Sequence, residues 1–255
     1  MRIEGETSVK YADDVNSRFD TLELVREGES KIIRRVDDAI LAIRLKPTVY
    51  SFTHQRYGEV PGTENLRLKA SIVLWQRLID AGIPVPVVAA SENCYLCKEV
   101  DAPPIEVIVK SFYVGTPKHL YRGLPATRTR HASLIEVGSK HEPYVRFDWR
   151  NPLPDKDECL PLWLADQFID TAKAEPLALK AFDVLSSFLA SRGIEIQDIC
   201  FFIDATGSCI FGEISPDCMR VKYQGSDLDK DLWRNGKKAG DVLSRWSTFV
   251  RLIKG

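Results

Sequence analysis

The sequence lacks a long apolar run. None of its 255 residues falls in a stretch that approaches the roughly 18 apolar residues of a membrane span. The start, MRIEGETSVKYADDV, is polar and carries acids where a signal peptide needs an apolar segment. The six cysteines are scattered and not spaced as a disulfide framework, which is typical of reduced thiols. We therefore expect a cytoplasmic protein that does not bind a membrane.

An excess of charge of either sign is also missing. The chain has 35 Lys and Arg against 36 Asp and Glu, so no overall field attracts nucleic acid, and any anion site must be local. Hydrophobic residues make up 44% and charged residues 28%, which excludes a collagenous, low-complexity or disordered chain. The length allows one large domain or two lobes.

Familiar catalytic strings are absent as well. The chain contains no GxGxxG, GxxxxGK[ST], GxSxG or HExxH. Cys94 and Cys97 have the spacing of half a zinc site, but no second CxxC and no HxxxH follows. We interpret this pair as two small buried or half-buried hydrophobes.

The apolar pattern predicts strands and helices in both halves of the chain. Residues 21–45 form a glycine-punctuated antiparallel sheet in this interpretation, and residues 105–114 form a buried strand. Helical spacing between Leu66 and Ile79 predicts a helix, with Thr63 as its N-cap. Residues 118–150 hold seven basic residues against three acids and are expected to be a solvated or anion-facing connection.

The second half continues this pattern. Helical periodicity over 162–192 is expected to break at Pro176, and a hairpin is expected around 204–207. Residues 242–253 predict a closing amphipathic helix. The first lobe closes near Pro103 and Pro104, which gives an N-terminal sheet lobe at 1–102 and a C-terminal α+β lobe at 103–255.

Polar residues are dense after residue 212. The segment 212–220 reads GEISPDCMR, and Asp227 to Asp231 with Arg234 follow within a dozen residues. Pro216 ends a strand ladder, so the side chains after it are expected at a strand's end, where loops carry binding groups. A solvated turn is the alternative.

Five segments in register connect the chain to a known family. They are Glu27-Gly28-Glu-Ser-Lys31, Ala81-Gly-Ile-Pro84, Glu106-Val-Ile-Val-Lys110 with Gly115-Thr116, Gly212 to Arg220, and Asp229-Lys-Asp231 with Arg234. In this order the chain resembles the SAICAR synthetase (phosphoribosylaminoimidazole-succinocarboxamide synthetase) family. The resemblance implies a two-lobe α+β fold, with a small antiparallel sheet lobe that covers ATP and a larger mixed α/β lobe that holds a phosphoribosyl imidazole carboxylate and aspartate. In that family ATP and magnesium activate the carboxylate as an acyl phosphate for attack by the aspartate amine.

The resemblance also implies roles for the site residues. Arg220 stands at the family's phosphate-binding arginine, Thr116 at a serine and Lys110 at an arginine, so a phosphate cradle is expected. The expected acid and base groups around the base or ribose are Glu213, Asp217, Lys230 and Asp231. The other expected substrate-binding residues are Ser215, Asp229 and Arg234.

The ATP side departs from the family pattern. Of the nucleotide loop only Gly28 and Lys31 remain, because Glu29 stands where the family has a lysine and would repel polyphosphate. Phe202 stands at a metal-binding glutamate, and Gly212 stands at an acid. Neither side chain offers the hard oxygen that magnesium needs, so we predict no metal site and neither ATP nor magnesium as cofactor.

Cys200 stands where the family has a lysine. It is either a nucleophile or, as the favoured interpretation, a buried inert thiol.

Three functions stay open. The first is an enzyme that acts without ATP on a 5′-phosphorylated, purine-pathway-like ribonucleotide, in nucleoside antibiotic biosynthesis of the pentostatin or coformycin kind. The second is an ATP-dependent carboxylate-amine ligase of purine biosynthesis whose metal ligands have moved to Asp198, Asp204 or Glu213. The third is a non-catalytic nucleotide-binding protein. The expected partner is a small phosphorylated ribonucleotide, and because relatives often pair, a homodimer is expected.

Overall fold

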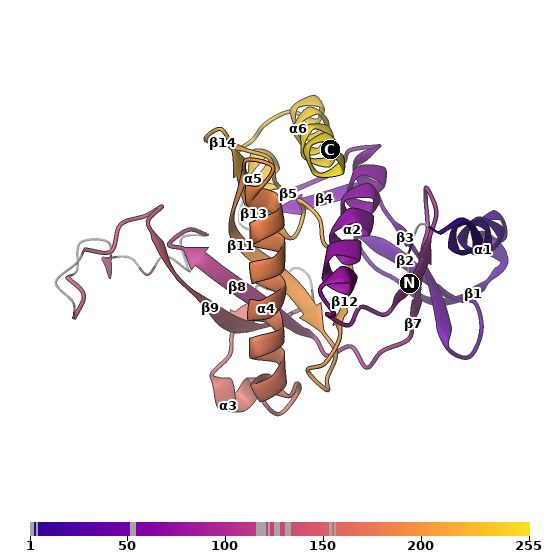
Figure 1. Ribbon diagram of the computed structural model, residues 1–255, viewed down its shortest axis with the longest axis horizontal. Coiled ribbons are helices and arrows are strands. Elements are labelled where there is room, and N and C mark those ends of the chain that lie inside the picture. The colour runs from indigo at the N-terminus through magenta and orange to yellow at the C-terminus, as the bar shows by residue number, and fades with distance from the viewer. Residues whose placement is uncertain are drawn as a thin grey trace.

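The computed structural model describes residues 3, 5–51, 55–115, 121, 123–124, 128–130, 134–152, 155 and 157–255. The fold is α+β and is built on two antiparallel sheets (Figure 1). The smaller sheet has five strands in the order β1 (Glu23–Glu27), β2 (Lys31–Arg35), β3 (Ile40–Leu45), β7 (Tyr95–Lys98) and β6 (Val87–Ala90). A separate hairpin pairs β4 (Thr48–Ser51) with β5 (Arg56–Glu59).

Two helices enclose the small sheet. The N-terminal helix α1 (Glu6–Ser17) packs Ala12 and Val15 against one face, and a short 3-10 turn (Phe19–Thr21) follows it. Helix α2 (Thr63–Asp80) covers the other face. The predicted N-cap at Thr63 is wrong by one residue, because Gly62, at φ +99°, occupies that position and Thr63 begins the helix.

The larger sheet carries the second half of the chain. Its strands follow the order β10 (Glu158–Cys159), β9 (Lys140–Trp149), β8 (Ile105–Phe112), β11 (Ile194–Ile203), β13 (Met219–Tyr223) and β14 (Ser226–Asp227), and β12 (Ile210–Phe211) pairs with β11. The expected hairpin around 204–207 is thus confirmed. The expected connection over 118–150 is wrong in its last part, because β9 pairs with β8 from Lys140 to Trp149.

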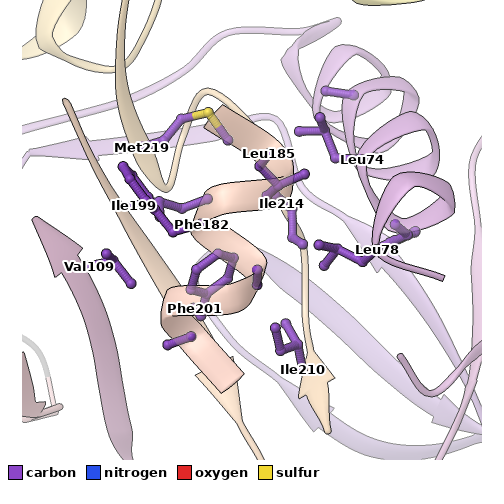
Figure 2. Close-up of a cluster of buried hydrophobic side chains, with 14 of the residues drawn as sticks. Leu74, Leu78, Val109, Phe182, Leu185, Ile199, Phe201, Ile210, Ile214 and Met219 are labelled. Carbon is purple, nitrogen blue, oxygen red and sulfur yellow. The ribbon is translucent and has the colours of Figure 1, made fainter. Parts of the chain in front are cut away.

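Helix α4 (Thr171–Ala190) covers one face of the large sheet, after the short helix α3 (Leu162–Ala165). It runs through Pro176 without the predicted break. The missing N–H costs one helical hydrogen bond, and the burial of Ala174, Ala178 and Leu185 against the sheet outweighs that loss. Figure 2 shows Phe182 and Leu185 of α4 between the strands and α2.

The chain closes with α5 (Asp231–Arg234) and the amphipathic helix α6 (Ala239–Lys254), as predicted for residues 242–253. Trp233 and Trp246 of these helices form a cluster with Val49 and Val60, so the C-terminal segment packs on the β4–β5 region. Within the described residues, no helix is long and apolar enough to cross a membrane.

Candidate functional site

The two faces of the large sheet differ in polarity. On β8, Ile105, Val107 and Val109 are fully buried in the core shared with α4. Because side chains alternate along a strand, Glu106 and Lys110 project from the opposite face. The chemistry of the site is gathered on that opposite face, which we call the ligand face.

One end of the ligand face is a buried cluster of cations around a carboxylate. Asp198 Oδ2 lies 2.8 Å from Lys110 Nζ and 2.6 Å from Arg220 Nη1, and the three residues sit side by side on β8, β11 and β13. Burial opposes ionisation of Asp198, but the charges of Arg220 and Lys110 outweigh it and hold its pKa below the ordinary value. The structure therefore brings together two of the three residues predicted to bind phosphate. Thr116, the third, lies outside the described residues.

The segment after β14 adds a second layer to this cluster. Asp231 lies between two arginines, accepting hydrogen bonds from Arg220 Nε at 3.0 Å and from Arg234 Nη1. Asp229 accepts the backbone amides of Val221 and Asp231, both at 2.7 Å, and so fixes the entry into α5. Burial and the neighbouring Asp231 charge raise the pKa of Asp229 to about 7.

The GEISPD segment is buried and not displayed on a solvated strand end. Arg67 of α2 forms two hydrogen bonds with Glu213, at 3.0 and 2.5 Å, and both side chains are less than a tenth exposed. Ser215 Oγ donates to Glu213 at 3.0 Å and accepts the backbone N–H of Asp217 at 3.1 Å. The sequence reasoning missed Arg67, whose only signal was a basic residue within the apolar stripe of a helix.

Asp217 and Lys230 form a half-buried pair at 3.1 Å. Burial opposes ionisation of Asp217, yet Lys230 and Arg67 lower its pKa. Its second oxygen, Oδ1, is buried and has no hydrogen-bond partner among the described residues. An unpaired carboxylate oxygen can accept a hydrogen bond from a hydroxyl or amine group of a ligand.

The far end of the ligand face meets the small sheet. Two cations lie over the ring of Phe202. Lys31 Nζ, from β2, is 5.8 Å from the ring centroid, and Arg150 Cζ is 5.4 Å from it. Gly212 packs against the same ring, since a Cβ there would lie 3.3 Å from Phe202 Cδ2. Two of the positions that depart from the family pattern therefore contact each other.

This end does not fit a magnesium ion. Phe202 and Gly212 supply no oxygen ligand, and the charges of Lys31 and Arg150 would repel a divalent ion. Glu106, on the adjacent strand β8, is a carboxyl group at this end. The three alternative metal ligands already have other partners. Asp198 pairs with Lys110 and Arg220, and Glu213 pairs with Arg67. Asp204 accepts hydrogen bonds from the backbone amides of Ser208 and Cys209, at 2.9 and 2.7 Å. No group of three or more His, Cys, Asp or Glu residues that could hold a metal occurs in the described part of the chain.

The β1–β2 turn carries Gly28 and Lys31, the two residues expected to remain of the nucleotide loop. Gly28 N–H donates to the Lys31 carbonyl at 2.9 Å, and Glu29 is exposed at the tip. Burial lowers the pKa of Lys31, as do the nearby charges of Arg150 and Arg67, although Glu213 opposes this. Lys31 thus faces the site while Glu29 points its charge at solvent.

The thiols are poorly suited to nucleophilic roles. Burial raises the pKa of Cys200 well above the ordinary value, and the charge of Glu106 adds to the shift. Burial also raises the pKa of Cys94 and of Cys97 to about 12. These shifts favour the interpretation of all three as inert thiols.

Comparison with known proteins gives the family. The family model for SAICAR synthetase matches residues 24–251. The chain belongs to the SAICAR synthetase family. It is 30% identical to the phosphoribosylaminoimidazole-succinocarboxamide synthase of Nitratiruptor over 91% of this chain and 96% of that one. A solved SAICAR synthetase in complex with ADP superposes with a TM-score of 0.76 at 25% identity, over 91% and 97% of the two chains.

A different relative comes from a fungus. The chain is 28% identical over 96% of its length to bifunctional cordycepin biosynthesis cluster protein 3 of Cordyceps militaris. It spans 35% of the length of that protein. A relative of this chain thus bears the name of a cordycepin biosynthesis cluster, which is consistent with the nucleoside antibiotic type that the resemblance implied.

Proposed function

We propose that this SAICAR synthetase homologue is an enzyme that binds a small, 5′-phosphorylated, purine-pathway-like ribonucleotide and acts on it in nucleoside antibiotic biosynthesis, without ATP or magnesium. The observation that carries the proposal is the contrast between the two ends of the ligand face. Lys110 and Arg220 form a buried cationic end, whereas Phe202 and Gly212 at the other end supply no oxygen ligand for a metal.

The cationic end suits a phosphate monoester. Lys110, Arg220 and Arg234 carry three positive charges, and Asp198 and Asp231 carry two negative ones. Buried donors that are already held in place lose little entropy when they bind an anion, and an arginine fork matches phosphate oxygens. In this proposal Asp217 Oδ1 accepts a ribose hydroxyl or a base amine, and Ser215 with Glu213 hold the segment in position.

The second candidate is an ATP-dependent carboxylate-amine ligase. It is favoured by the similarity to synthases along nearly their whole length and by the retention of Lys31 and Glu213. The contact of Phe202 with Gly212 disfavours it, because the ring fills the space beside the glycine where an acidic side chain would have to lie.

Calorimetry with AMP and ribose 5-phosphate tests the binding. Wild-type protein is expected to bind both, without any effect of Mg²⁺. Arg220→Lys should bind more weakly, since lysine keeps the charge but loses the fork, and Arg220→Glu should not bind. Arg245→Glu, an exposed position on α6, is the matched control. No binding of either compound by the wild-type protein refutes the proposal.

Turnover separates the candidates. ADP release on incubation with the aminoimidazole carboxylate ribonucleotide, aspartate and magnesium ATP would establish the ligase. Conversion of a phosphoribosylated purine without ATP would establish the proposed enzyme, and saturable binding without turnover would leave a binding protein.

A further inference from the structure

Glu106 lies on the same face of the same strand as Lys110. Four residues of an extended strand separate them by about 13 Å, a span that a nucleoside 5′-monophosphate can cover between its phosphate and its base. Between the two lie Ile108 and, paired with it on β11, Cys200. The ligand face therefore has cations at one end, an apolar floor in the middle and a carboxyl group at the far end.

Charged groups from several elements face Glu106. Asp148 is its direct cross-strand partner on β9, and Asp157 follows that strand, while Arg150 and Lys230 bring opposite charge. The effects of burial and of the two aspartates outweigh those of Arg150 and Lys230 and raise the pKa of Glu106 to about 7. Arg146 is committed to both oxygens of Asp148, at 2.7 and 2.8 Å. Among the described residues none donates a hydrogen bond to the Glu106 carboxyl group.

The other carboxylates of the site are committed to partners. Glu213 is held by Arg67, and Asp231 lies between two arginines. Their cationic partners favour the ionised form of Asp231 and of Asp217, whose pKa values are lowered despite burial. Asp229 accepts two backbone amides at 2.7 Å, which ties it to the fold. Glu106 alone among these carboxyl groups combines access to the ligand face with freedom from a structural partner in the described residues.

We infer that Glu106 is a catalytic residue that contacts the heterocyclic base of the bound ribonucleotide and exchanges a proton with one of its nitrogens. The inference rests on the proposed function. In the forward step the Glu106 O–H bond breaks and an N–H bond forms on the base. The carboxylate left behind on Glu106 stabilises the cationic base, and the reverse step returns the proton to Glu106.

The experiment compares a ligand with a base and one without. AMP carries a basic ring nitrogen, whereas ribose 5-phosphate offers the phosphate alone, so the ratio of their affinities isolates the contribution of the base. For wild-type protein the affinity for AMP relative to that for ribose 5-phosphate should fall above about pH 7, by up to about tenfold per pH unit, because Glu106 must be protonated to bind the base. In Glu106→Gln the ratio should not depend on pH, since an amide does not titrate. Glu195→Gln, exposed on β11, should keep the wild-type profile.

A second pair of variants tests the placement. Cys200→Lys puts an ammonium group beside Glu106 and should move the break in the pH profile to lower pH, whereas Cys200→Met should leave it in place. A merely structural Glu106 would give no such movement. Binding of both ligands with a pH-independent ratio in the wild-type protein overturns this inference alone. Binding of neither overturns the proposed function, and the inference with it.

Discussion

Arg220 donates a hydrogen bond to Asp198 across two adjacent strands, at 2.6 Å, and both side chains are largely buried. The same carboxylate oxygen accepts from Lys110. The carboxylate keeps the two cations together in the free protein, which would otherwise repel each other. It also competes with any phosphate that approaches them, so stability and ligand affinity depend on Asp198 in opposite directions.

Asp198→Asn should therefore lower stability and strengthen phosphate binding. Removing one partner of a buried ion pair costs about 3–5 kcal/mol of unfolding free energy. Urea unfolding with and without ribose 5-phosphate measures both effects. The ligand should raise the unfolding free energy of the variant by more than that of the wild type. Asp227→Asn is the control, because the Lys222–Asp227 pair is about one third exposed and contributes about 1 kcal/mol or less. Weaker binding of ribose 5-phosphate by Asp198→Asn would contradict this account of the cationic end.

The pair between Arg67 and Glu213 connects α2 to the segment after β12. Arg67→Ala leaves a buried carboxylate without its cation, so the unfolding free energy should fall by about 3–5 kcal/mol. The double variant Arg67→Met with Glu213→Gln should lose less than either single variant, because no buried charge is left unpaired. Arg245→Ala, on the exposed face of α6, should change stability by about 0.5 kcal/mol or less. Denaturant titration of the wild type, Arg67→Ala, Arg67→Met, Glu213→Gln, the double variant and the control tests this, and additive losses in the double variant would exclude a direct charge pairing.

Most of the strands and helices with a regular alternation or helical repeat of apolar residues could be predicted from the sequence. The hairpin of β11 and β12 and the helix α6 follow from apolar periodicity and turn residues alone. Strand β9 escaped detection because its polar alternation, as in Arg146 and Asp148, serves the ligand face and looks like a solvated run. The helix break predicted at Pro176 is wrong because helix propensity reflects only the local sequence, whereas α4 is stabilised by its packing against the sheet.

The site residues that lie in family motifs could be predicted from the sequence. Their contacts with residues from other helices and strands could not. Arg220 and Lys110 stood in motifs, and the structure places them together. Their common carboxylate, Asp198, and the contact of Arg67 with Glu213 join residues 22 to 146 positions apart. No pattern in one sequence reports such distant pairing.

Gly58 lets the β4–β5 hairpin approach α5. A Cβ at this position would lie 2.8 Å from Trp233 Cζ2, while Arg56 stacks on the same indole with its Cζ 3.5 Å from the ring centroid. Gly58→Ala should displace Trp233, cost about 1–3 kcal/mol and weaken ribose 5-phosphate binding, because α5 carries Asp231. Gly240→Ala, in α6 with open space around it, should be neutral or stabilising. Unchanged affinity in Gly58→Ala would show that α5 is positioned by other contacts.

The pKa of Glu106, raised from 4.5 to about 7, has a defined consequence for stability. Between these values the folded state binds more protons than the unfolded state, so this group reduces stability as pH rises from about 4.5 to about 7. Glu106→Gln removes the titration and should be more stable than the wild type at pH 8, by about 1–2 kcal/mol after allowance for partial solvent access, with no gain below about pH 4. Thermal or urea unfolding across this range tests the sign, with Glu195→Gln as the control. A gain that is the same at every pH would mean that packing, and not the charge of Glu106, changes the stability.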